Sequence, residues 1–159
     1  MNDVRANATI AYINKRFVYV FGGFKINEAQ VGVYQNTYEV LDLNNLTGGW
    51  TLNSFDKIGI GMRLSAMGVI NMDEKSVLLC GGYDGSLYKK DVFRIETNQK
   101  EISNVDSKVK NILPGNFIFL QNNFVKIDDY AYNFDLAMNI IRFDPSDSSF
   151  KVNNPNQAK

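Results

Sequence analysis

Arg16-Phe17-Val18-Tyr19-Val20-Phe21-Gly22-Gly23 is the stretch that decides the fold, and Lys75-Ser76-Val77-Leu78-Leu79-Cys80-Gly81-Gly82 repeats its pattern. Each is a run of aromatic, β-branched or aliphatic residues closed by two glycines. Such a run favours a β-strand, and the glycines permit a positive φ or a close backbone approach where the chain turns. A third run, residues 128–135, aligns with these two but lacks the glycines. Strand patterns recur along the whole chain, and the sequence predicts an all-β fold.

Two further markers follow each run in the same order: an acidic residue that ends a second strand, and a bulky apolar residue that opens a further one. The acids lie 54 and 48 residues apart and the apolar residues 52 and 48 apart; they are Asp42, Glu96 and Asp144, and Trp50, Ile102 and Phe150. A period of this length indicates stacked structural repeats. We expect Trp50 and Phe150 to fill the wedge between adjacent repeats.

The pattern resembles the Kelch repeat, in which a hydrophobic strand ends in Gly-Gly, a second strand carries a tyrosine and an acid, and a tryptophan follows. The first unit is similar at Gly22-Gly23, Leu41-Asp42 and Trp50, whereas the second carries Ile95 and Ile102 at the aromatic positions. The resemblance implies a Kelch-type β-propeller segment of about three four-stranded antiparallel blades in one domain. Blade 1 covers about residues 6–55, blade 2 about 56–104 and blade 3 about 105–153, before a short polar tail.

Closed propellers usually have four to eight blades, so three blades leave two faces uncovered. Two explanations are open: the chain is a fragment of a longer protein, or two copies combine into a six-bladed ring with two-fold symmetry.

Composition argues against several classes of function. The 17 basic and 17 acidic residues leave no net charge for binding nucleic acid or a membrane surface. The chain has no histidine and one cysteine, so we expect no catalytic residue, no metal and no cofactor. A lone Cys80 and the absence of a signal-like N-terminus predict a cytoplasmic protein. An enzyme of the galactose-oxidase kind, whose catalytic domain also resembles Kelch repeats, remains a rival that would need histidine ligands.

The candidate partner-binding residues lie mainly in the segments that follow the glycine pairs. They are Lys25, Glu28 and Tyr34 in the first segment, Tyr83, Asp84 and Tyr88 in the second, and Arg63 between them. The resemblance implies that these loops emerge on one face and hold a partner protein, and tyrosine is enriched among interface hot spots. Arg63 can bind an acidic partner residue bidentately near the channel mouth, or pair with a neighbouring blade.

The resemblance also suggests the kind of partner: a cytoskeletal protein or an adaptor of a ubiquitin ligase. The alternative is a structural half-propeller whose partner is another copy of itself.

Other motifs have a purely structural explanation. The glycine pairs are not followed by the lysine-serine pair or helix start that phosphate binding needs, so we interpret them as turns. Asp84-Gly85 and Asp128-Asp129 are each predicted to form a turn rather than a metal or acid–base site. Cys80 lies within an apolar run, which predicts a buried, unreactive thiol.

Overall fold

The computed structural model describes residues 1–55, 67–98, 101–106, 123–135 and 137–154, and within them the chain forms three four-stranded antiparallel sheets. Sheet 1 has the order β1-β2-β5-β6: β1 (Thr9–Ile13), β2 (Phe17–Phe21), β5 (Thr37–Asp42) and β6 (Trp50–Ser54). Sheet 2 contains β7 (Gly68–Asn71), β8 (Ser76–Cys80), β9 (Val92–Asn98) and β10 (Glu101–Asp106) in sequence order. Sheet 3 contains β11 (Val125–Ile127), β12 (Tyr130–Phe134), β13 (Ile140–Asp144) and β14 (Ser149–Asn153). The all-β prediction is confirmed.

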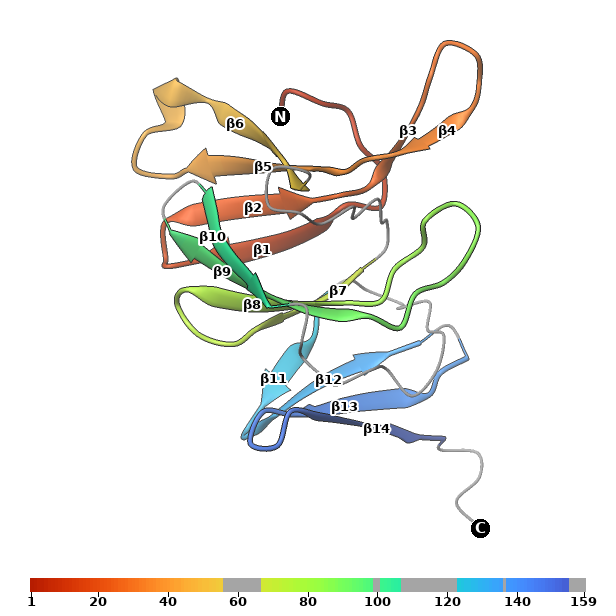
Figure 1. Cartoon of the computed structure of the whole chain (residues 1–159). Helices are drawn as coiled ribbons and strands as arrows, with labels where there is room; N and C mark the ends of the chain where they lie inside the picture. The colour runs from red at the N-terminus through yellow and green to blue at the C-terminus, as the bar shows by residue number, and fades with distance from the viewer. Residues whose placement is uncertain (56–66, 99–100, 107–122, 136, 155–159) are drawn as a thin grey trace.

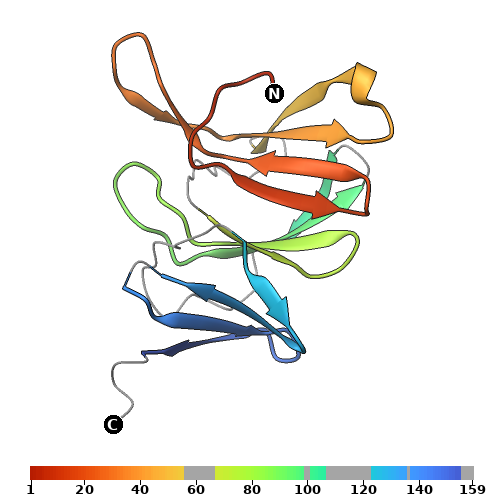
Figure 2. The same ribbon diagram turned by 180° about the vertical axis from the view of Figure 1, so that it is seen from behind.

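Two smaller elements complete the description. Strands β3 (Phe24–Ile26) and β4 (Gly32–Tyr34) form a separate hairpin inserted between β2 and β5, and a short 3-10 turn, η1 (Leu46–Gly48), precedes β6. No helix among the described residues has the length and apolar character that a membrane span needs. Figures 1 and 2 show the three sheets stacked one on another, with sheet 2 in the middle.

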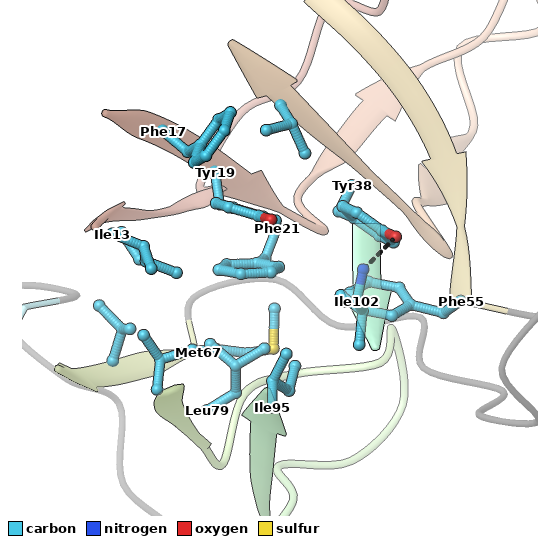
Figure 3. Packing of buried hydrophobic residues seen from close by; sticks show 14 residues of the cluster. Ile13, Phe17, Tyr19, Phe21, Tyr38, Phe55, Met67, Leu79, Ile95 and Ile102 are labelled. Atoms are coloured by element: carbon cyan, nitrogen blue, oxygen red, sulfur yellow. Dashed lines mark hydrogen bonds between the residues drawn. The ribbon is translucent and has the colours of Figure 1, made fainter. Parts of the chain in front are cut away.

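The first hydrophobic core lies between sheets 1 and 2 (Figure 3). Its aromatic side comes from sheet 1, where Tyr19 and Phe21 stack with ring centroids 5.6 Å apart. Tyr38 adds a polar contact, because its hydroxyl accepts a hydrogen bond from the backbone N–H of Ile102 at 3.1 Å. The members from sheet 2 and the residue before it are Met67, Val69, Val77, Leu79, Ile95 and Ile102.

The second core lies between sheets 2 and 3, and it explains why β8 is apolar at successive positions. Val77 and Leu79 point into the first core, whereas Leu78 and Cys80 point into the second. All five residues of β8 are buried, as expected for a strand covered on both faces. Cys80 is fully buried, as predicted, and burial raises the pKa of its thiol, which disfavours the reactive thiolate.

The glycine pairs form the predicted turns. The φ angles of Gly22 and Gly23 are 57° and 92°, and those of Gly81 and Gly82 are 64° and 107°. A β-carbon at Gly23 would lie 2.8 Å from the carbonyl oxygen of Ala6. In both sheets the chain therefore leaves the end of the second strand in a backbone conformation that favours glycine.

Sheet 3 differs by one residue from its sequence alignment. In sheet 1 the first residue of β2, Phe17, lies opposite Asp42. In sheet 3 Ala131 lies opposite Phe143, so the preceding residue, Tyr130, takes the place that corresponds to Phe17. The strand that corresponds to β2 therefore begins at Tyr130, one residue later than the sequence alignment placed it. The alignment had no glycine pair to mark the end of this strand. A shift of one residue moves each side chain to the opposite face of the sheet. The two aspartates before β12 form the predicted hairpin turn.

Trp50 and Phe150 were both expected between adjacent repeats, and only Phe150 lies there. Its ring packs 4.8 Å from Phe143, against the second core. Trp50 lies opposite Leu41, on the face of sheet 1 that points away from sheet 2. The prediction for Trp50 is wrong within the described residues, because it occupies the equivalent strand position on a sheet that has no preceding neighbour.

A candidate protein-binding surface on two paired loops

The candidate site consists of two loops that leave neighbouring sheets at equivalent points. The β3–β4 hairpin, residues 24–34, follows Gly22-Gly23, and a second loop, residues 83–90, follows Gly81-Gly82. Figures 1 and 2 show both loops projecting from the same edge of the stack. We call residues 24–34 and 83–90 the paired loops.

Tyrosine rings join the paired loops. The ring of Tyr34 meets Tyr83 edge-on at 5.7 Å, and Tyr83 contacts Tyr88 at 4.7 Å. On the other side Tyr34 contacts Phe24 at 5.9 Å. The Tyr34 ring also lies so close to Gly85 that a β-carbon there would be 2.6 Å from it. Aromatic pairs of this kind each contribute about 0.5–1.5 kcal/mol beyond area burial, so the cluster holds one loop against the other.

Asp84 fixes the second loop. Its Oδ1 accepts hydrogen bonds from the backbone N–H of Ser86 and Leu87 at 2.9 and 2.8 Å, and its Oδ2 pairs with Lys89 Nζ at 2.6 Å. The Lys89 ammonium, followed by the two N–H groups, holds the pKa of Asp84 well below its usual range. The predicted turn at Asp84-Gly85 is confirmed, with Gly85 at φ 100°.

The N-terminal residues anchor the base of the hairpin. Ala6 and Phe24 exchange two backbone hydrogen bonds, of 2.8 and 2.9 Å. Lys25 Nζ pairs with Asp3 Oδ1 at 3.0 Å. Arg5 and Glu39 form an ion pair at 3.0 Å whose side chains are both fully buried. The hairpin is therefore tied to sheet 1 through the segment that precedes β1.

The structure brings together four of the predicted site residues, Tyr34, Tyr83, Asp84 and Tyr88. Tyr34 and Tyr83 are half-buried in the cluster, and desolvation raises the pKa of the Tyr34 hydroxyl. Lys25 stands at the base and Glu28 at the exposed tip of the hairpin, so neither joins the cluster. Arg63 lies outside the described residues.

The same loops also expose aliphatic side chains that were not among the predicted site residues. Ile26 is 62% exposed and Leu87 63%, while Val31 and Val33 are also exposed. Tyr88, at 39%, is the predicted aromatic residue that reaches the surface most. Ile26, Val31 and Val33 lie in the segment after Gly23, where residue type alone had singled out Lys25, Glu28 and Tyr34.

A cavity of about 940 Å³ opens at the opposite edge of sheets 1 and 2, and it is the alternative to the paired loops. Its charged residues are balanced: Arg16, Lys75, Arg94, Asp73, Glu74 and Glu96. Most of them already have partners: Arg16 forms a bidentate pair with Asp42, Asp73 accepts hydrogen bonds from Lys75 and Ser76, and Arg94 Nε lies 3.8 Å from Glu96 Oε1. Its lining therefore carries no surplus charge for an ionic ligand. The paired loops are the better candidate.

Comparison with known proteins identifies the architecture alone. No family model and no curated protein matches the sequence. A solved structure titled "Structure of YjhT" is similar with a TM-score of 0.64 and 12% sequence identity, over 98% of this chain and 53% of that chain. The chain thus spans about half the length of that solved structure, and the likeness supports an all-β arrangement of antiparallel sheets.

Proposed function

We propose that the three sheets are consecutive blades of a Kelch-like β-propeller arc and that this arc is a scaffold for binding a partner protein. The blade assignment is supported by three facts. Each sheet has four antiparallel strands, the glycine pairs end the second strand of sheets 1 and 2, and the similar solved structure is about twice as long. Propellers commonly bind through the loops at one edge of the blades, which is where the paired loops lie.

One observation carries the binding role: exposed apolar side chains stand on loops that are already fixed. Ile26 and Leu87 project from a frame held by the Tyr34–Tyr83 contact and the Asp84 turn. Fixed loops lose little conformational entropy on binding, so more of the contact energy becomes affinity. Burying one such aliphatic side chain contributes about 1.5–3 kcal/mol. Tyr88 beside them adds an aromatic residue of the kind found at hot spots.

The shape of this surface favours a protein partner over a small molecule. Its apolar side chains stand on projecting loops and not inside a closed pocket, and protein interfaces combine apolar centres with polar rims. Glu28, Asp84 and Lys89 supply charged groups around the exposed side chains. A cytoskeletal protein or a ubiquitin-ligase adaptor is the class of partner that the Kelch resemblance suggests.

The test compares two matched variants in a quantitative pull-down from cell extract. Leu87→Asp places a charge on the paired loops, and Leu46→Asp places the same charge on η1, where Leu46 is 62% exposed. We expect proteins captured by the wild type to be lost with Leu87→Asp, by about 30-fold for a hot-spot residue. They should be retained by Leu46→Asp. Equal loss with both variants, or capture unchanged by Leu87→Asp, would contradict the proposal.

A further inference from the structure

Each end of the stack carries an apolar face that no other sheet of this chain covers within the described residues. On sheet 1 we define the outer face as the side turned away from sheet 2; its apolar residues are Ile10, Tyr12, Val18, Val20, Leu41, Trp50 and Leu52, of which Val20 is already buried. On sheet 3 the outer face is the side turned away from sheet 2; its apolar residues are Val125, Ile127, Tyr130, Tyr132, Phe134 and Ile140. Ile10 and Tyr12 are each 51% exposed, Val125 50% and Ile127 54%.

The outer face of sheet 3 occupies positions that the other sheets bury. Phe21, Cys80 and Phe134 each end the second strand of their sheet. Phe21 and Cys80 are fully buried, because the next sheet covers them, whereas Phe134 is 38% exposed. Sheet 3 thus presents aromatic and aliphatic side chains where the repeat places a contact with a following sheet.

The exposed residues are concentrated on the strands where sheets approach most closely. Inside the molecule the first strands face each other: β1 lies against β7, and Asn123, just before β11, bridges to Val69 of β7. Ile10 and Tyr12 lie on β1, and Val125 and Ile127 lie on β11. At the sheet 1 end, β1 is therefore exposed where a preceding sheet would pack. At the sheet 3 end, β11 is exposed where a following sheet would pack.

We propose that a second copy of this chain covers both outer faces, with sheet 3 of each copy packing on sheet 1 of the other. The two contacts are equivalent under a two-fold axis, and closure gives a ring of six sheets. The length of the similar solved structure is consistent with this stoichiometry, because one copy of the chain covers 53% of it.

The area of the faces is sufficient for a stable dimer. Four strands spaced about 4.8 Å apart, each about five residues long at 3.3 Å per residue, give a face of roughly 300 Å² in projection. A closed pair brings together four such faces, about 1,200 Å² in total when the N-terminal segment is counted as part of the sheet 1 face, which is the lower end of the range of stable protein interfaces. The proposal is independent of the paired loops, which lie on the edge of the sheets and not on these faces.

The N-terminal residues cover part of the outer face of sheet 1 and leave the side of β1 open for this contact. Asn2, Asp3 and Arg5 gather around Glu39, which lies in the central strand β5 of the outer face of sheet 1. Ile10 and Tyr12 on β1 stay exposed beside them. The second copy would therefore seat its Val125 and Ile127 against β1, next to the N-terminal segment and not beneath it.

Molar mass in solution tests the proposal. Light scattering should give twice the 18.0 kDa of one chain. Ile10→Asp and Ile127→Asp each put a charge in both symmetric contacts, and should raise the dissociation constant at least about 100-fold. Leu87→Asp, on the paired loops, is the matched control and should leave the mass unchanged. Circular dichroism of each variant checks that the fold is intact, since both substituted residues are more than half exposed.

Three results would overturn the proposal: a wild-type chain that remains a monomer at tens of micromolar, a dimer that survives both substitutions, or a dimer lost equally with Leu87→Asp. Closure has its own test in the double variant Ile10→Cys/Ile127→Cys, because Cys80 is buried and does not compete. A short bismaleimide should link it into a covalent dimer. A ladder of longer products would show an open chain of copies and contradict the ring.

Discussion

Replacing Arg5 by methionine should destabilise the protein and loosen the paired loops, because Arg5 is the centre of the N-terminal anchor. Its Nη1 donates to the carbonyl oxygens of Gly22 and Thr37 at 2.8 and 3.1 Å, and its Nη2 donates to Glu39 Oε1 at 3.0 Å. Both members of the ion pair are fully buried. Methionine keeps much of the aliphatic stem, so the substitution mainly removes the charge and its hydrogen bonds.

The expected cost follows from what remains around Glu39. Removing one member of a buried ion pair costs about 3–5 kcal/mol, because the other charge stays buried without compensation. Glu39 would still accept hydrogen bonds from the backbone N–H groups of Asn2 and Asp3. These two donors offset part of the loss, and we expect Arg5→Met to lower the free energy of unfolding by about 3 kcal/mol. The double variant Arg5→Met/Glu39→Leu removes both charges and should cost less than the sum of the single variants by at least about 2 kcal/mol.

Urea denaturation of the wild type, the two single variants and the double variant completes this cycle. The protein concentration must be held constant, since self-association would add to the apparent stability. The same anchor supports the hairpin through the Ala6–Phe24 hydrogen bonds, so Arg5→Met should also accelerate amide exchange in β3. Single-variant costs below about 1 kcal/mol, or costs that add without coupling, would refute the view that this pair anchors the segment.

Three further predictions concern the loops and the core. Gly85→Ala should lower the free energy of unfolding, measured by urea denaturation, by about 1–3 kcal/mol, since Gly85 has a φ of 100° and lies against the Tyr34 ring. Gly32→Ala is the matched control and should be close to neutral, because a β-carbon at Gly32 would have no neighbour within 4 Å. Asp84 has a lowered pKa, so its stabilisation is fully present well above the ordinary value of 3.8 and is lost as the pH falls through and below that value. The stability difference between wild type and Asp84→Asn should be constant above about pH 5 and shrink under acid. A difference independent of pH would exclude the ion pair. Cys80 should react with a thiol reagent only in denaturant, and rapid labelling of the native protein would contradict its burial.

The fold was predictable where the sequence repeats a local signal. Gly22-Gly23 and Gly81-Gly82 each mark the end of a second strand, because positive φ at these points leaves few other choices. Where the signal is missing, the register was misjudged: without a glycine pair, β12 was placed one residue too early. Trp50 shows a different limit. Its strand position was correctly equated with that of Phe150, but a local pattern does not say whether a neighbouring sheet is present to cover it.

The candidate site was only partly predictable for a related reason. Tyr34, Tyr83 and Tyr88 could be chosen from residue type, since aromatic residues on loops are unusual enough to suggest contacts. Their roles depend on a contact between segments about 50 residues apart in sequence. In that contact Tyr34 and Tyr83 pack on each other and hold the two loops together, so their rings are not free to bind a partner. The exposed Ile26 and Leu87 escaped notice because isolated aliphatic residues in a loop carry no pattern of their own.

The glycine pairs connect the two proposed surfaces. Because each pair ends the second strand of its sheet, the loops that follow must leave from the same edge, and the tyrosines of neighbouring sheets can meet there. The faces of the sheets are thereby left free to stack on one another, and alternate residues of β2 and β8 pack between the stacked sheets. Edge and face are chemically separate, so a charge at Leu87 should affect partner binding alone and a charge at Ile127 should affect self-association alone. If the ring forms, it presents two sets of paired loops related by a two-fold axis, and a partner with two binding segments would gain avidity without any new contact.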